Sequence, residues 1–270
     1  MKLKKACAAF TLGGLFLLAG CSSHFNTVED IQNKGKLVVA TNAEFAPFEF
    51  KEGSEFIGID IDLAKAYATS LEVSIDIQDM DFDAALLSVS TNKADMAIAG
   101  ITKNSKREQT LSFTDSYYTA SQVVIVRTES TYSSLTTEED ILNALTDAHA
   151  KIGCQRGTTG QYYIEGDADW EFEGIADTTC IPYDNGALAV NALANGQIDA
   201  VIIDEAPAKL YCKKVTGVQT LDVVLTEEEY AIAVAKGNES LVASLNTFIA
   251  KCKQDGTFEA IVNEYYGQAE

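Results

Sequence analysis

The chain has 270 residues, of which 40 are acidic and 20 basic, so its formal net charge at neutral pH is −20. A surface this acidic repels nucleic acid and anionic lipid head groups, which argues against both as partners. The length suits one large domain or two lobes of ordinary size.

The first 20 residues predict a signal peptide. Three lysines stand within the first five residues, and the apolar run from Ala6 to Gly20 is too short for a membrane span and ends in small residues. The sequence Leu18-Ala19-Gly20-Cys21 resembles the lipobox of bacterial lipoproteins, in which the cut precedes the cysteine and its thiol carries the lipid. An ordinary secretory signal with an incidental cysteine is the alternative. We expect a lipid on Cys21 and a polar leash over residues 21–29. The protein would then lie in the cell envelope, held by its lipid alone and facing the periplasm or the cell exterior.

Strand and helix patterns alternate through the first half of the chain. Apolar strand patterns cover residues 36–41, 56–61 and 95–100, and a short alternating strand covers 73–77. Helical spacing covers 63–68 and 82–90. Such alternation predicts an α/β fold with a parallel or mixed sheet that is covered on both faces.

A second set of the same kind follows Tyr118. Strands are predicted at 122–126, 151–155, 180–183, 199–203 and 230–235, and helices at 138–150, 157–163, 188–194 and 205–211. Two amphipathic helices, 240–252 and 258–265, end the chain. We expect one lobe from residues 30–118 and 230–270, and a second lobe from 119–229. Short extended crossings near 118–121 and 226–230 would join them.

Four cysteines follow Cys21, at 154, 180, 212 and 252, and their spacing fits neither a zinc site nor a redox motif. Cys154 and Cys180 each lie in a strand-like run. They could form a disulfide between neighbouring strands, or they could be two small buried side chains, and the sequence leaves both interpretations open. The sequence predicts no metal site and no cofactor.

The segment from Ala94 to Tyr118 contains the most informative residue. Its buried strand pattern ends in Gly100 and Thr102, and Arg107 follows in a polar turn. A guanidinium just past the end of a buried strand is placed to hold a small carboxylate with two parallel hydrogen bonds. A solvated Lys-Arg-Glu turn is the alternative.

Two further segments lie where a crevice at the carboxyl ends of strands would be. Gly157-Thr158-Thr159-Gly160 follows a strand and opens a helix, which makes it either an anion seat or a simple capping turn. It lacks the lysine and the spacing of a nucleotide-binding loop. Asp204 ends a strand before a helix, so it is either the N-cap or the counter-charge of an ammonium group.

Phe45 and Phe82 both follow predicted strands. Each phenylalanine suits a hydrophobic core, and as a pair they could instead form two aromatic walls around the stem of a ligand.

Several motifs in this order resemble the family 3 extracellular solute-binding proteins of bacterial amino-acid importers. The resemblance covers nearly the whole chain after the signal peptide and rests on KLVVATNAEFAPFEF, FIGIDIDLAKAYA, ADMAIAGITKNSKREQTLSFTDSYY, IGCQRGTTG and GQIDAVIIDEAPA. It implies a two-lobed, periplasmic-binding-protein-like fold of type II, a venus-flytrap that closes around its ligand by bending at two hinge crossings. It also implies a monomer that binds a free polar or basic L-amino acid and delivers it to the membrane permease of an ABC importer.

The resemblance also implies a role for each matching residue. Arg107 would bind the α-carboxylate, Asp204 would bind the α-ammonium, and Phe45 and Phe82 would sandwich the side chain. The residues expected to assist the carboxylate are Thr102, the backbone at Gly100, and the N–H groups of Thr158 and Thr159; those expected to face the distal end of the side chain are Asn42 and Gln155.

Asn42 and Gln155 are also where this chain departs from relatives that carry an aspartate and a lysine. They suggest a neutral polar ligand such as glutamine. Glu44 and the net negative charge of the chain leave arginine and lysine as alternative ligands.

Two other functions fit parts of the sequence. Some small dehydratases resemble this family, but an enzyme needs a positioned general acid or base. The two histidines are His24 in the leash and His149 near the end of a helix, and neither is expected to face the crevice, although carboxylates are plentiful. A surface lipoprotein with an adhesin or antigen role is the other alternative. Binding without catalysis is the interpretation we carry forward.

Overall fold

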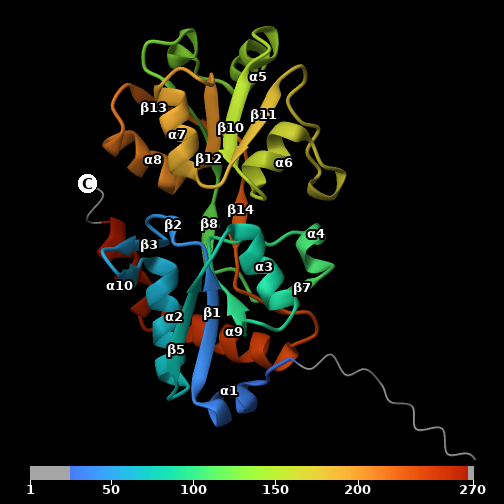
Figure 1. Ribbon diagram of the computed structural model, residues 1–270, viewed down its shortest axis with the longest axis vertical. Coiled ribbons are helices and arrows are strands. Elements are labelled where there is room, and N and C mark those ends of the chain that lie inside the picture. The colour runs from blue at the N-terminus through green and yellow to red at the C-terminus, as the bar shows by residue number, and fades with distance from the viewer. Residues whose placement is uncertain (1–24, 267–270) are drawn as a thin grey trace, which may run out of the picture.

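The computed structural model describes residues 25–266, and the predicted signal peptide and Cys21 lie outside this range. Two lobes, each built around its own sheet, stand one above the other with the chain passing between them twice (Figure 1). Within residues 25–266, no helix is long and apolar enough to span a membrane.

Lobe 1 is a mixed five-stranded sheet with helices on both faces. Strand β1 pairs in parallel with β5 and β6, and β15 returns from the far end of the chain to pair antiparallel with β6 and β7. In sheet order the strands are β5 (Ser74–Asp79), β1 (Lys36–Thr41), β6 (Met96–Ala97), β15 (Ala233–Ala235) and β7 (Leu111–Phe113). The helices are α1 (Val28–Lys34), α2 (Ile59–Ser70), α3 (Phe82–Ser90), α4 (Ser105–Glu108), α9 (Glu239–Gln254) and α10 (Thr257–Tyr266), and a small sheet comprises β2 (Glu44–Phe45), β3 (Glu49–Glu52) and β4 (Glu55–Ile57).

Lobe 2 repeats the plan with a second five-stranded sheet. Its central strand β12 is buried along its whole length, as expected for a strand covered by helices on both faces. In sheet order the strands are β11 (Thr179–Tyr183), β10 (Lys151–Gln155), β12 (Ala200–Asp204), β9 (Gln122–Arg127) and β13 (Val218–Val224). The helices are α5 (Glu138–Asp147), α6 (Thr159–Glu165), α7 (Gly186–Ala194) and α8 (Glu205–Lys214), with the 3₁₀ turns η1 (Thr131–Ser134) and η2 (Ala168–Trp170).

The two crossings form a short antiparallel ribbon. Strand β8 (Tyr118–Ala120) pairs with β14 (Glu228–Tyr230), with Ala120 opposite Glu228 and Tyr118 opposite Tyr230. A two-stranded connection of this kind leaves the lobes free to bend about it, as hinge closure requires. The expected fold class, a two-lobed venus-flytrap with two hinge crossings, is confirmed.

Several predicted elements differ from the structure. The apolar run 230–235 is two strands, β14 and β15, because the chain leaves the hinge at Tyr230 and joins the lobe 1 sheet at Ala233. The predicted strand 56–61 ends at Ile57, since Gly58 turns the chain (φ +124°) into helix α2. The leash expected through residue 29 is too long, because α1 begins at Val28 with Thr27 as its capping residue.

The cysteine pair left open by the sequence is a pair of free thiols. Cys154 and Cys180 lie on neighbouring strands β10 and β11 with their sulfurs 3.4 Å apart. The contact with the Cys180 thiol, followed by burial, raises the pKa of Cys154, so this group stays protonated.

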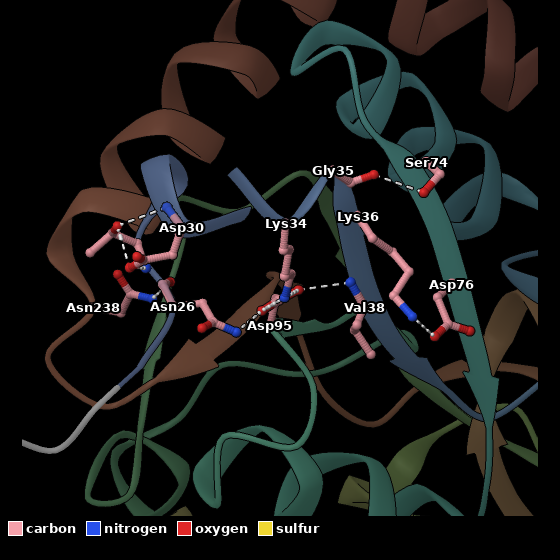
Figure 2. Close-up of polar contacts among 11 residues, drawn as sticks. Asn26, Asp30, Lys34, Gly35, Lys36, Val38, Ser74, Asp76, Asp95 and Asn238 are labelled. Atoms are coloured by element: carbon pink, nitrogen blue, oxygen red, sulfur yellow. Dashed lines mark hydrogen bonds and ion pairs between the residues drawn. The ribbon is translucent and has the colours of Figure 1, made fainter. Parts of the chain in front are cut away.

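A buried carboxylate fixes the N-terminal helix to lobe 1 (Figure 2). Asp95 accepts hydrogen bonds from the side chains of Asn26 and Lys34 and from the backbone N–H of Val38, at 2.7–2.8 Å. It thus joins three segments, namely the entry to α1, the end of α1 and strand β1. A carboxylate with several charge-assisted donors is among the stronger polar contacts that a protein can make.

We predict that Asp95→Ala lowers the free energy of unfolding by about 2–3 kcal/mol, because it leaves three donors without their acceptor. The matched control is Asp76→Ala, which removes the more exposed Lys36–Asp76 pair (Figure 2) and is expected to cost about 0–1 kcal/mol. Urea unfolding of the two variants tests this. Equal losses would show that the buried network does not hold lobe 1 together.

Candidate ligand-binding site

A pocket lies between the two lobes, and all ten ligand-binding residues named from the sequence line it. The space not filled by atoms is about 300 Å³, including the part that is open to solvent. The ten are Asn42, Phe45, Phe82, Gly100, Thr102, Arg107, Gln155, Thr158, Thr159 and Asp204, and Glu49 and Ala99 complete the lining. The structure therefore brings together residues from the N-terminal segment of lobe 1 and from lobe 2.

Arg107 is buried and is not a solvated turn residue. It lies on α4, whose N-cap Asn104 accepts from the Arg107 N–H, and its side chain is 8% exposed. The guanidinium donates to the Thr102 carbonyl in lobe 1 (2.6 Å) and to the Gly157 carbonyl in lobe 2 (3.1 Å). A guanidinium has five donors, so others remain for a ligand carboxylate. Burial lowers the Arg107 pKa to about 10, which still leaves it charged at neutral pH.

Asp204 occupies the N-cap position of α8, but its side chain makes no capping hydrogen bond. Its carboxylate instead accepts from the Tyr230 hydroxyl in the hinge strand β14. Burial, together with the charge of Glu228, raises the pKa of Asp204 to about 7. A buried carboxylate without a cationic partner is costly, and an ammonium group would relieve that cost. Arg107 on lobe 1 and Asp204 on lobe 2 thus offer opposite charges from opposite sides of the pocket.

A third charged group, Glu228 of the hinge, was not expected from the sequence. One of its oxygens accepts from the hydroxyls of Thr102 in lobe 1 and Thr159 in lobe 2, both at 2.6 Å. The other oxygen accepts from Gln122 (3.0 Å) and Thr226 (2.7 Å). A hydroxyl has one proton to donate, so the Thr102 side chain is already engaged in this closed form. A ligand carboxylate would then be met by Arg107 and by backbone N–H groups at the start of α6.

The aromatic pair and the amide pair define the rest of the pocket. Phe45 and Phe82 line it, each 6% exposed, so they are core residues that also present a surface to a ligand. Gly100 adopts a positive φ (+52°), and a Cβ there would lie 2.9 Å from the Phe45 ring, which explains the glycine. The Gln155 amide nitrogen donates to Asn42 (2.8 Å), which joins the lobes across the pocket.

Two residues that line the pocket each have a buried acceptor atom without a hydrogen-bond partner. The atoms are Oε1 of Gln155 and Oε2 of Glu49. Glu49 is 1% exposed and lies in hydrogen-bond contact with Asp60, which itself accepts from the Gly100 N–H and the Tyr117 hydroxyl. Burial, followed by the nearby Asp60, raises the pKa of Glu49, and burial raises that of Asp60 to about 6. Since neither carboxyl forms an ion pair within the described part of the chain, the pair holds a proton.

Comparison with known proteins identifies the family. The model of the bacterial extracellular solute-binding proteins, family 3, matches residues 37–268. The chain belongs to this family. Among curated relatives, a probable histidine-binding protein of Neisseria gonorrhoeae is 29% identical over 99% of this chain and 97% of its own length. A putative ABC transporter arginine-binding protein 2 of Escherichia coli is 30% identical over 93% and 96%. A crystal structure of a mutant of ArgBP from T. maritima superposes with a TM-score of 0.79 and 30% identity, covering 89% of this chain and 99% of that one.

The buried carboxyls predict that ligand affinity depends on pH. An ammonium group requires ionised Asp204, so below pH 7 binding must first remove a proton, and affinity should fall by up to about tenfold per pH unit as the pH drops to 5. Calorimetric titration at pH 5, 6, 7 and 8 measures this. The control is His149→Gln, which changes an exposed side chain outside the pocket lining and should leave the profile unchanged. A flat profile in the unsubstituted protein would contradict the assignment.

The same shift predicts a gain in stability on Asp204→Asn. Because the pKa of Asp204 is raised in the folded state, protonated Asp204 contributes to the stability of the fold. That contribution is fully present below the unfolded pKa of about 3.8 and is lost as the pH rises through about 7. At pH 8 the ligand-free Asp204→Asn variant should therefore melt about 2–4 °C above the unsubstituted protein, the scale of about 1 kcal/mol in a domain of this size. At pH 4 the two melting temperatures should agree. Calorimetric melting at both pH values decides it.

Proposed function

We propose that the protein captures a polar L-α-amino acid as a zwitterion between its lobes and passes it to the membrane permease of an ABC importer. The observation that carries the proposal is the placement of buried Arg107 on lobe 1 and buried Asp204 on lobe 2, facing one pocket. Each ligand charge loses hydration on burial and needs a partner of opposite sign. A molecule with both charges at adjacent atoms bridges the lobes, and closure is then favoured by that ligand alone.

The side chain of the ligand should be a hydrogen-bond donor. The partnerless atoms of the two pocket-lining residues, Oε2 of Glu49 and Oε1 of Gln155, are both acceptors. Arginine, lysine, histidine and glutamine carry N–H donors, whereas the carboxylates of aspartate and glutamate would meet further acceptors and negative charge. The names of the relatives, for histidine and arginine, lie within the donor group. We place arginine first, because its cation would favour loss of the proton held by the Glu49–Asp60 pair and would then face a negative charge.

Glu44 does not line the pocket, although the sequence suggested it as an acidic group that would favour arginine or lysine. Its carboxylate accepts from the Asn185 amide (2.7 Å) at the exposed margin between the lobes. Glu49, five residues further on, takes over the role of an acidic group beside the ligand.

Binding without catalysis remains our proposal for this scaffold. His149 is exposed after α5 and faces the Asp177 carbonyl, well outside the pocket lining. We also propose that the mature chain is held in the cell envelope by a lipid on Cys21. An adhesin role would be compatible with the same ligand site and has no observation of its own in its favour.

Calorimetric titration of the chain from residue 25 onward with each of the twenty amino acids tests the proposal. One or more donor-bearing amino acids should bind and be recovered chemically unchanged. Arg107→Ala should weaken that binding by about 1.5–3 kcal/mol or more, the scale for losing a charged hydrogen bond. The control is Arg156→Ala, which removes an exposed arginine that pairs with Asp184. No binding by any amino acid, or equal affinity in both variants, would refute the proposal.

Glu49→Gln tests which part of the ligand Glu49 contacts. If its carboxylate faces the side chain, arginine should lose about tenfold or more in affinity while glutamine loses less, because a neutral amide needs no counter-charge. Titration of both amino acids into both proteins gives the comparison. Equal losses would place Glu49 beside the α-ammonium, and no loss would remove it from the site.

A further inference from the structure

Three consecutive residues of the short helix α4 in lobe 1 each contact lobe 2. The Ser105 hydroxyl donates to the Asp169 carbonyl (2.7 Å), the Lys106 ammonium pairs with the Asp167 carboxylate, and the Arg107 guanidinium donates to the Gly157 carbonyl. In Figure 1, α4 and α6 lie on the same side of the molecule, at facing margins of the two lobes. We call residues 105–107, together with residues 167–170 of lobe 2, the lobe latch.

The centre of the lobe latch is the Arg107 guanidinium, which contacts one aromatic ring from each lobe. Its central carbon lies 5.1 Å from the ring centroid of Phe82 in lobe 1 and 5.0 Å from that of Trp170 in lobe 2. Both distances are within the range of cation–π attraction, which is strongest where water is excluded. Arg107 and Trp170 are each 8% exposed, so this contact is largely dry.

Trp170 is itself held firmly in lobe 2. Its indole stacks on Tyr162 at 5.0 Å and 22° and on Phe172 at 6.0 Å and 27°. Backbone hydrogen bonds between Asp167 and Phe172, at 2.9 and 3.1 Å, close the loop that carries it. Lys106 adds a second cation over the same aromatic group, 4.6 Å from the Tyr162 ring. The indole is therefore a fixed surface against which the guanidinium can settle.

The lobe latch exists only when the lobes are closed, and apart from Arg107 its side chains do not line the ligand pocket. Opening would take away Trp170 and the Gly157 carbonyl together, leaving the guanidinium with Phe82 and the Thr102 carbonyl. Bidentate recognition of a carboxylate depends on the plane of the guanidinium, which a stacked ring fixes.

We propose that Trp170 is a positioning residue for the carboxylate-binding arginine, and that the lobe latch sets how long a bound amino acid is retained. The inference rests on the proposed function, since it assumes that an amino-acid carboxylate occupies Arg107. Because Trp170 meets the arginine and not the ligand side chain, its contribution is the same for every amino acid that binds. Specificity then resides in the pocket, and residence time in the lobe latch.

The chain supplies a direct readout, because Trp170 is its single tryptophan. In the unsubstituted protein, saturating L-arginine or L-glutamine, whichever the titration shows to bind, should shift the tryptophan emission and reduce its quenching by acrylamide. Unchanged emission and unchanged quenching in a protein that binds the amino acid would show that Trp170 does not follow closure.

Release rates test the positioning role. In a chase experiment, Trp170→Ala should release radiolabelled L-arginine or L-glutamine about 3- to 30-fold faster than the unsubstituted protein. Trp170→Phe, which keeps an aromatic face, should release it at nearly the unsubstituted rate. Association rates should change less, since they precede formation of the lobe latch. Asp167→Asn leaves the indole intact and should also speed release, with less dependence on salt than the unsubstituted protein. The matched ion-pair control is Lys209→Ala, whose partner Glu205 lies on the same helix.

The outcomes separate the two proposals. A protein that binds none of the twenty amino acids overturns the proposed function and this inference with it. If the protein binds an amino acid, but the unsubstituted chain, Trp170→Ala and Asp167→Asn all release it at the same rate, the result overturns the lobe latch alone. Loss of affinity for one amino acid and not for another in Trp170→Ala would also overturn it, because that result would make Trp170 a side-chain contact.

Discussion

The structure depends on how it buries charge between two lobes. Arg107 is the single basic side chain among the described residues that line the pocket, whereas Glu49 and Asp204 line it and Asp60 and Glu228 contact its walls. Closing such a site without a ligand takes carboxyls out of water, which raises the pKa of Asp60 and of Asp204 and favours their protonated forms. The closed form is therefore electrostatically incomplete, and the missing charge pattern defines what can complete it. Stability is given up at the place where recognition is needed, a compromise common to binding sites.

Much of the scaffold follows from local pattern. The strand from Ala200 to Asp204 and the helix from Phe82 to Ser90 are long enough, and apolar enough, for periodicity to identify them. A continuous apolar run does not indicate where a chain changes the strand with which it pairs, however. The run from Tyr230 to Ala235 therefore did not show that the chain leaves the hinge ribbon and enters the lobe 1 sheet. That change is decided by which strand edges are available in three dimensions.

The same distinction separates the site residues that could be predicted from those that could not. Strand ends and motifs indicated Arg107 and Asp204, because their chemistry is unusual for their position. Glu49 lies in a charged hairpin whose sequence predicts exposure to solvent, yet it is buried and lies against Asp60 on α2. Trp170 lies in the acidic segment Asp167–Gly174, where apolar residues alternate with acidic ones. That alternation gives no sign of a contact with the other lobe, and only the closed arrangement of the lobes brings Trp170 to Arg107. Contacts between lobes leave little trace in either lobe's own sequence pattern.

The network at Asp95 has a mechanical consequence. Asn26, the second described residue, is bonded to the lobe 1 sheet through Asp95 and to the start of α9 through Asn238 (Figure 2). Any tension that reaches the folded chain from its N-terminal side therefore acts on lobe 1 at the end away from lobe 2 (Figure 1). The load passes into lobe 1 without crossing the β8–β14 ribbon. Lobe 2 is consequently the part of the molecule that such a load would leave free to move about the ribbon.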